Sequence, residues 1–268
     1  MTLSSWMRRL TGSLTSFALC CPAQEKYVIN TGKKEKPMKV KIFFMIFFFL
    51  SLSFSLFCQD PQELIAQGDK LYADMADMAT AQEALSKYRD ALLKDRGSYE
   101  AYWKIARIHY YIGSHTESNK EKKAIFSQGI YYAKKAIEVK PDKPDGYYWL
   151  GVLDGVYGEA RGVLKSLFLV KPIKEAMNKV IELDRSYEDG GPDRVLGRVY
   201  YKLPGFAGGD NKKSLEHLLK SKEFGPNDPV TRCYLADTYL ELKEVDKARA
   251  ELEFVLNMAS DPRWALSI

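Results

Sequence analysis

Few side chains in this sequence combine the types and spacings that enzymes use for chemistry. The three histidines, His109, His115 and His217, are far apart in the chain, and none belongs to an HExxH pair that could hold zinc. The GxSxG pattern of serine hydrolases does not occur, and GGDNKKS at 208–214 matches a phosphate-binding loop only loosely. We therefore predict that the protein is not an enzyme and that it needs neither a metal nor a cofactor.

The same polar residues have ordinary structural interpretations. His109 takes the place of an aromatic residue in a helical repeat, which favours a packed core position, whereas His217 is expected on the solvated face of an amphipathic helix. Cys233 is expected to be an inert thiol within a helix. Asp210 or Asn211 is expected to cap the helix that follows the glycines.

The net positive charge comes from the N-terminal part of the chain. There are 40 Lys and Arg against 35 Asp and Glu, and eight of the bases but only two of the acids lie in 1–58. This leaves 32 bases and 33 acids in 59–268. Phosphate binding needs concentrated Lys and Arg on the folded part, so we predict no nucleic-acid partner. Cys233 is the only cysteine in 59–268, which excludes a disulfide framework there.

An apolar run near the N-terminus has the pattern of a secretion signal. Ile42–Phe57 contains no charge and is rich in Phe, and Lys39 and Lys41 come just before it. The run is shorter than the roughly 20 residues that a membrane-spanning helix needs. We predict that 38–58 is a signal peptide or lipoprotein signal, and that the protein is exported to the periplasm or anchored to a membrane as a lipoprotein.

The processing of this signal has two alternatives. Ser53–Ser55 fits the small-x-small form of an ordinary cleavage site, whereas Cys58 is a candidate for lipidation and hence for a membrane tether. Phe57 is bulky where lipoprotein signals usually carry a small residue, so both alternatives stay open. Residues 1–37 are mostly polar and lack periodicity, and we predict a mis-annotated or disordered extension, with translation starting at Met38.

A helical repeat is the main feature of the remaining sequence. The clearest unit runs from Pro229 to Pro262, and its 34 positions are the tetratricopeptide length. Ala236 and Ala248 are expected where its two antiparallel helices come closest, because a larger side chain would overpack that contact. Larger apolar residues at helical spacing are expected to fill the surrounding core: Leu235, Tyr239, Leu252 and Val255.

The same register recurs four times upstream. The recurring residues are Gly68 and Tyr72 with Ala84, Ile105-Ala106 with Ala133, Leu150-Gly151 with 180–184, and Leu196-Gly197 with Ser214 and Leu218. No helical pair can bury its apolar face alone, so the pairs must stack. We predict an all-α fold for 59–268, made of about five tetratricopeptide-like helical hairpins stacked in a curved solenoid.

The second and third units are longer than this period, by roughly ten to fifteen residues between their helices. Residues 156–172 of the third unit are expected to be an extra helical segment. One alternative is a longer helix packed in the core. The other is the wall of a ligand channel, since ligand pockets are apolar with a few placed polar groups. The candidate ligand-binding residues are Arg161, Leu164, Lys165, Leu167 and Phe168.

Aromatic residues crowd two of the predicted helices. One helix carries Tyr99, Tyr102, Trp103, Tyr110 and Tyr111, and the other opens with Tyr147, Tyr148 and Trp149. One face of each helix must serve the core, and repeat positions account for many of these rings. Any remaining Tyr and Trp side chains are good contact residues for a partner or an apolar ligand.

From about Tyr147 to Leu256 the chain resembles the T component of the tripartite ATP-independent periplasmic (TRAP) transporters. The phrases that carry the resemblance are YYWLG (147–151), ARGVLKSLFLVKPI (160–173), GGPDRVLGRVYYKLPGFAGGD (190–210) and the final repeat. The resemblance implies an exported homo-oligomer with a hydrophobic pore, whose lipidated cysteine Cys58 would match. It also implies a periplasmic solute-binding protein as partner and a small apolar or organic-acid ligand. The implied pore wall is the candidate set in 161–168.

Two functions follow from the sequence. The first is an exported binding or adaptor protein, an accessory component of periplasmic solute transport with a hydrophobic ligand channel. The alternative is a scaffold of the cell envelope that binds proteins through its repeat surface and takes no small molecule.

Overall fold

The computed structural model describes residues 60–258, which all belong to the second of the two units, Met1–Ser55 and Leu56–Ile268, into which the chain divides. The described part is helical throughout and contains no strand, which confirms the predicted all-α class. Its elements are α2 (Pro61–Ala73), α3 (Met78–Lys94), α4 (Tyr99–Ser114), α5 (Asn119–Val139), α6 (Pro144–Arg161), η1 (Val163–Leu169), α7 (Val170–Asp184), α8 (Tyr187–Lys202), η2 (Gly205–Ala207), α9 (Asn211–Phe224), α10 (Pro229–Glu241) and α11 (Val245–Leu256).

Several predictions for the N-terminal part lie outside the described residues. They are the extension 1–37, the signal 38–58 and lipidation of Cys58. Between residues 60 and 258, none of the helices combines the length and the hydropathy needed to cross a membrane.

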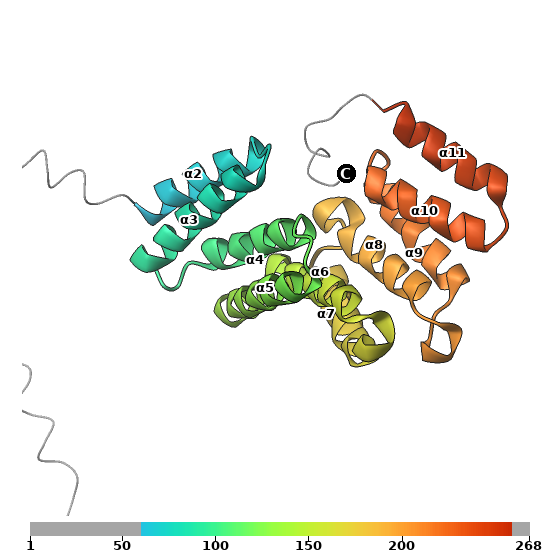
Figure 1. The fold of residues 1–268 in the computed structure, drawn as a ribbon, viewed down its shortest axis with the longest axis horizontal. Helices are drawn as coiled ribbons and strands as arrows, with labels where there is room; N and C mark the ends of the chain where they lie inside the picture. Colours follow the sequence, from blue (N-terminus) through green and yellow to red (C-terminus); the bar gives the residue numbers. More distant parts are fainter. Residues whose placement is uncertain (1–59, 259–268) are drawn as a thin grey trace, which may run out of the picture. The chain divides into compact units, whose positions relative to one another are not determined.

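The helices form the five predicted antiparallel pairs (Figure 1). Within a pair the two helices pack closely, as α4 does against α5 and α8 against α9. Successive pairs touch through their first helices as well, so that α6 contacts α4 and α8, and α8 also contacts α10. These first helices therefore form one continuous row, as expected for stacked hairpins.

Local sequence signals start the helices where the pairs require them. Asp77, Asp210 and Asp228 cap α3, α9 and α10, each accepting hydrogen bonds from backbone N–H groups of the first turn. Pro61, Pro144 and Pro229 stand at the starts of α2, α6 and α10, where a missing N–H costs nothing. The predicted capping role of Asp210 is thus confirmed.

Small residues lie where the paired helices touch, as the repeat pattern predicts. Ala236 and Ala248 are both 1% exposed. A Cβ added to Gly197 of α8 would stand 2.6 Å from Cγ of Leu218 and 3.1 Å from the carbonyl oxygen of Ser214 on α9. These contacts leave no room for a side chain, so the spacing of each pair depends on them.

The extra length of the second and third units is not a loop between helices. In the second unit only residues 115–118 join α4 to α5, and the additional residues extend α5 to 21 residues. In the third unit, 156–172 comprises the end of α6, the 3-10 helix η1 and the start of α7. The long helices are stable because α5 packs along both α4 and α6.

One polar residue predicted on a solvated face is part of a buried network instead. His217 is partly buried, and its Nδ1 lies 2.8 Å from Oδ1 of Asp193, a fully buried carboxylate. Arg185 donates two further hydrogen bonds to Asp193, at 2.7 and 3.0 Å. Burial alone would raise the pKa of Asp193, but the hydrogen bonds from His217 and Arg185 hold it below its ordinary value. His109, by contrast, is 2% exposed in the core, as predicted.

The core prediction is wrong at Leu252, which is 41% exposed on α11. Leu252 follows the repeat pattern, but α11 is the last helix of the described part. No further helix among residues 60–258 packs on the outer face of α11. A repeat position is buried only where a neighbouring pair packs on it.

A single methyl group tests the helix contacts at two glycines. Gly197→Ala should lower the free energy of unfolding by roughly 1–3 kcal/mol, because the methyl overpacks the α8–α9 contact. Gly155→Ala in α6 should raise it by about 0.5–1 kcal/mol, because its Cβ meets no atom within 4 Å and alanine favours the helix. Urea denaturation of both variants measures the effects, and equal signs would contradict this account.

A pH dependence follows from Asp154 on α6, which is 8% exposed. Burial raises the pKa of its carboxyl to about 6, with Lys134 acting in the opposite direction. Because the folded pKa lies above the unfolded one, its stabilising contribution is complete below about pH 4 and is lost as the pH rises through about 6.

Asp154→Asn should therefore make the protein more stable at pH 7.5 by about 2–3 kcal/mol, with little change at pH 4. Urea denaturation at both pH values measures this. The exposed Asp142→Asn is the control, and an effect of Asp154→Asn that is the same at both pH values would exclude the titration.

Candidate functional site

A cavity of about 630 Å³ runs along the row of first helices. It is lined by residues of α2, α4, α6, α8 and α10, together with η1 and the segments that flank α8 and α10. Of the second helices in the described part, only α7 contributes a lining residue, Val170. The five hairpins thus present their first helices to one shared pocket.

The middle of the pocket is apolar and is lined by short side chains. Four valines, Val152, Val156, Val195 and Val199, come from α6 and α8. Between them Gly155 faces open space, since an added Cβ would meet no atom within 4 Å. The missing side chain at this position therefore keeps the pocket open.

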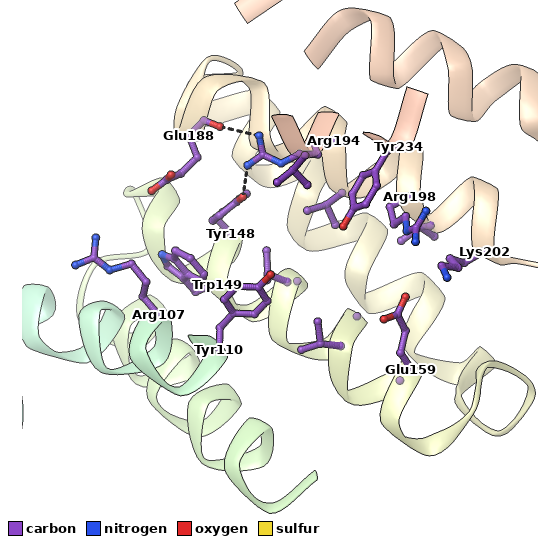
Figure 2. Close-up of a pocket in the computed structure, with 18 of the residues that line it drawn as sticks. Arg107, Tyr110, Tyr148, Trp149, Glu159, Glu188, Arg194, Arg198, Lys202 and Tyr234 are labelled. Atoms are coloured by element: carbon purple, nitrogen blue, oxygen red, sulfur yellow. Dashed lines mark hydrogen bonds between the residues drawn. The ribbon is translucent and has the colours of Figure 1, made fainter. Parts of the chain in front are cut away.

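One end of the pocket is held together by the buried guanidinium of Arg194 on α8 (Figure 2). It donates to Oδ2 of Asp228 at 2.6 Å, to the hydroxyl of Tyr148 at 2.9 Å and to the carbonyl of Glu188 at 3.3 Å. Burial by itself would lower the pKa of Arg194, but Tyr148 and Asp228 keep it above its ordinary value. Arg194 thus joins α6, α8 and the start of α10.

At the same end the backbone enters the left-handed region. Glu188, Asp189 and Gly190 have φ values of 50°, 56° and 76°. Glycine is required at 190, because a Cβ there would lie 2.8 Å from the carbonyl oxygen of Ser221. A glutamate and an aspartate adopt such angles rarely, and residues held this way are concentrated at functional sites.

Glu188 lines the pocket, its side chain lies on the same side as Arg107, and its carboxylate has no hydrogen-bonding partner among residues 60–258 (Figure 2). The side chain is exposed, yet the pocket walls exclude part of its water. This loss of hydration raises the pKa of Glu188 above its ordinary value, although Arg107 and Arg194 act in the opposite direction.

The opposite end is less tightly bound together. Arg198 pairs with Asp237 at 2.7 Å and lies 4.2 Å from the centre of the Tyr234 ring. Glu159 and Lys202 are exposed there (Figure 2).

Three buried polar atoms of pocket-lining residues have no hydrogen-bond partner. They are Nε of Arg107, Nε1 of Trp149 and Oγ of Ser166. Only one further such atom, on Glu244, occurs in residues 60–258. Unsatisfied buried donors are rare in folded proteins, and three of the four such atoms in residues 60–258 belong to residues that line this one cavity.

The residues predicted as ligand-binding do not line this pocket. Leu164 and Phe168 are 66% and 60% exposed, and the guanidinium of Arg161 lies 5.5 Å from the centre of the Phe168 ring. Lys165 is exposed and Leu167 is half-buried. The same segment contributes Val163 and Ser166 to the pocket instead. The 3-10 turn places these two on its inner side, whereas α-helical spacing predicts a different face.

The prediction that some Tyr and Trp side chains are available to contact a partner agrees better with the position of the pocket. Of the eight Tyr and Trp residues that crowd the two helices, four line the pocket, namely Tyr110, Tyr111, Tyr148 and Trp149. Glu188, Arg107 and Arg194 were not predicted. The GGPD phrase at 190–193 was the only sequence signal near them.

A protein-family model described as "Regulator of microtubule dynamics protein 1-3" matches residues 64–203, more than half of the chain. The chain belongs to this family. The predicted resemblance to the T component of TRAP transporters finds no support in the comparisons, because the matching relatives belong to this other family.

Two curated relatives illustrate the match. Regulator of microtubule dynamics protein 3 of Rattus norvegicus is 25% identical over an alignment of 207 positions, and the match covers 71% of this chain and 43% of the relative. Regulator of microtubule dynamics protein 1 of Mus musculus is 27% identical over 124 residues, which are 46% of this chain and 39% of the relative. The chain therefore spans less than half the length of these relatives.

A solved structure supports the fold. The chain is similar to a thermophilic TPR protein of Thermus thermophilus, with a TM-score of 0.58 and 19% identity. The match covers 77% of this chain and 97% of that protein. The likeness shows the tetratricopeptide-like fold and extends no further.

The two pocket arginines should differ in their effect on stability. Arg194→Ala leaves the carboxylate of Asp228, which is 1% exposed, without its ion-pair partner and should cost about 3–5 kcal/mol, although the capping hydrogen bonds of α10 remain. Arg198→Ala removes a pair whose Asp237 is 44% exposed and should cost about 1 kcal/mol or less. Urea denaturation at neutral pH measures both, and an equal loss would contradict the central role of Arg194.

Proposed function

We propose that this protein is a tetratricopeptide-like protein-binding module that takes an extended segment of a partner protein into the pocket along its first helices. The observation that carries this proposal is the concentration of unpartnered polar atoms around that pocket. Its partner, in this proposal, takes part in the control of microtubule dynamics.

The dimensions of the pocket suit a polypeptide. Its lining on α6 extends from Tyr148 to Glu159, a rise of about 17 Å at 1.5 Å per residue. An extended chain covers that distance with about five residues. The valines and Gly155 leave space for small apolar side chains in the middle of such a segment.

The unpartnered atoms suit the main chain of a bound segment. Nε of Arg107 and Nε1 of Trp149 are donors, and a peptide carries one carbonyl acceptor per residue. Each unsatisfied donor costs about 1–3 kcal/mol in the empty pocket, which binding would recover. These atoms are shielded from water, so the segment must shift nearby side chains, as is common at interfaces.

The names of the relatives support the second half of the proposal. They are called regulators of microtubule dynamics, and this chain matches less than half of their length. We therefore assign the chain a binding role within such regulation and no complete regulatory activity.

The size of the pocket favours a second candidate. A volume of about 630 Å³ falls within the roughly 300–1,000 Å³ of small-molecule sites, and its middle is apolar. A small apolar or organic-acid ligand, as expected from the sequence, is therefore the alternative. Export, a lipid tether, homo-oligomers and a periplasmic solute-binding partner remain predictions from the sequence.

Closing the pocket at Gly155 tests the proposal. A display library of random linear peptides longer than the pocket is selected on the full chain, and Gly155→Leu should weaken the selected peptides by at least about tenfold. The change fills open space within a helix, so folding should persist. Gly205→Leu is the matched control, because Gly205 also faces open space but lies outside the pocket.

The outcomes separate the two candidates. Absence of any peptide that Gly155→Leu weakens would overturn the proposal. A co-purified small molecule in native mass spectrometry that Gly155→Leu removes would favour the alternative. Adding the full chain to cell extract should change the rates of microtubule growth and shrinkage, and the Gly155→Leu variant should not. If neither protein changes these rates, the proposed link to microtubule dynamics is overturned, but peptide binding is not.

A further inference from the structure

The end of the pocket around Glu188 carries surplus negative charge. Arg107, Arg194, Asp189 and Asp145 are the charged groups that act on the Glu188 carboxylate. Arg107 shares the carboxylate of Asp69 with Lys104, and Arg194 pairs with Asp228. This set contains five acids and three bases: Asp69, Asp145, Glu188, Asp189 and Asp228 against Lys104, Arg107 and Arg194. Two acidic charges therefore remain without a counterpart among these groups.

Three of these acids, Asp145, Glu188 and Asp189, have no ion pair within the described part, and of the three only Asp145 accepts hydrogen bonds from side chains. Both arginines have a carboxylate within 4 Å, and Asp145 accepts hydrogen bonds from the hydroxyls of Tyr99 and Tyr187. Glu188 and Asp189 form no ion pair with any residue of the described part. Only Glu188 of these two is exposed within the pocket.

The local backbone holds Glu188 in this position. The N–H of Gly190 donates to the carbonyl of Ser186 at 3.2 Å, and Arg194 donates to the carbonyl of Glu188. Gly190 also packs against the backbone of α9. The carboxylate is therefore presented by a constrained turn and not by a flexible loop, so binding it costs little conformational entropy.

Aromatic rings surround the same end of the pocket. Figure 2 shows Tyr148, Trp149 and Tyr110 near Glu188 and Arg107, with Glu159 and Lys202 at the far end. The face of Tyr72 is already covered by Arg107, at 3.6 Å from the ring centre. Tyr148 and Trp149 are buried and pack against each other, and Trp149 also packs against Tyr110. These rings therefore form a wall of low polarity beside the carboxylate, in which an ionic contact is stronger than in water.

We propose that Glu188 selects a lysine or arginine of the bound segment, so that the pocket recognises a basic residue with small apolar residues beside it. This inference rests on the proposed peptide-binding function. A cation restores to Glu188 the stabilisation that it loses by partial removal from water. An acidic residue at this position would add a third uncompensated negative charge, which excludes acidic segments.

A double-mutant cycle tests the pairing. A peptide selected on the full chain, whose binding Gly155→Leu weakens, is synthesised with its Lys or Arg and with norleucine in that place. Norleucine and Glu188→Gln should each weaken binding about tenfold, and the two together no more than one alone. Glu117→Gln, an exposed acid outside the pocket, should change affinity less than about twofold. Isothermal titration calorimetry measures all affinities.

A second variant guards against misfolding. Asparagine tolerates the left-handed backbone, so Glu188→Asn removes the carboxylate and keeps the turn, and it should lose the same affinity. Selected peptides without a basic residue, or additive effects in the cycle, would overturn the inference while leaving peptide binding intact. Failure to select any peptide that Gly155→Leu weakens would overturn peptide binding, and this inference with it.

Discussion

At each helical pair, one position on the first helix must be nearly free of side chain, because the second helix packs directly against it. Gly197 and Ala236 show how little room there is at two such contacts. Close pairing fixes the tilt of each hairpin, and stacked hairpins bring successive first helices side by side. The pocket exists only because these first helices form one row. Its shape therefore depends on the contacts that each first helix makes with the second helix of its own pair, on the side away from the pocket.

The polar end of the pocket adds a second level of organisation. Arg194 donates hydrogen bonds to acceptors in three different segments: the turn at Glu188, Tyr148 of α6, and Asp228 at the start of α10. These hydrogen bonds connect the left-handed turn to both helices. A buried arginine with all its partners in place costs little, whereas the same group with one partner missing is strongly destabilising. The rigidity of the site therefore comes from an interaction that no single hairpin contains.

The phrase at 190–210 carried the resemblance to another family, and the structure explains its residues by architecture. Gly190 and Gly197 make close backbone contacts, and Asp193 anchors a buried network with Arg185 and His217. Such demands belong to the fold and not to a particular function. Family membership came from the match over 64–203.

The sequence alone determined the helical class, the five pairs, the small residues at their contacts and the cap at Asp210, because these are periodic or local signals that hardly depend on distant residues. It also placed four pocket aromatics on the correct helices. Only the tertiary structure decided which of those rings face the pocket, since a shift of one residue turns a side chain by about 100° around a helix. The pairing of Arg194 with Asp228, the exposure of Glu188 and the position of Ser166 likewise depend on how separate hairpins stack. No local pattern contains that information, because the partners lie on different helices.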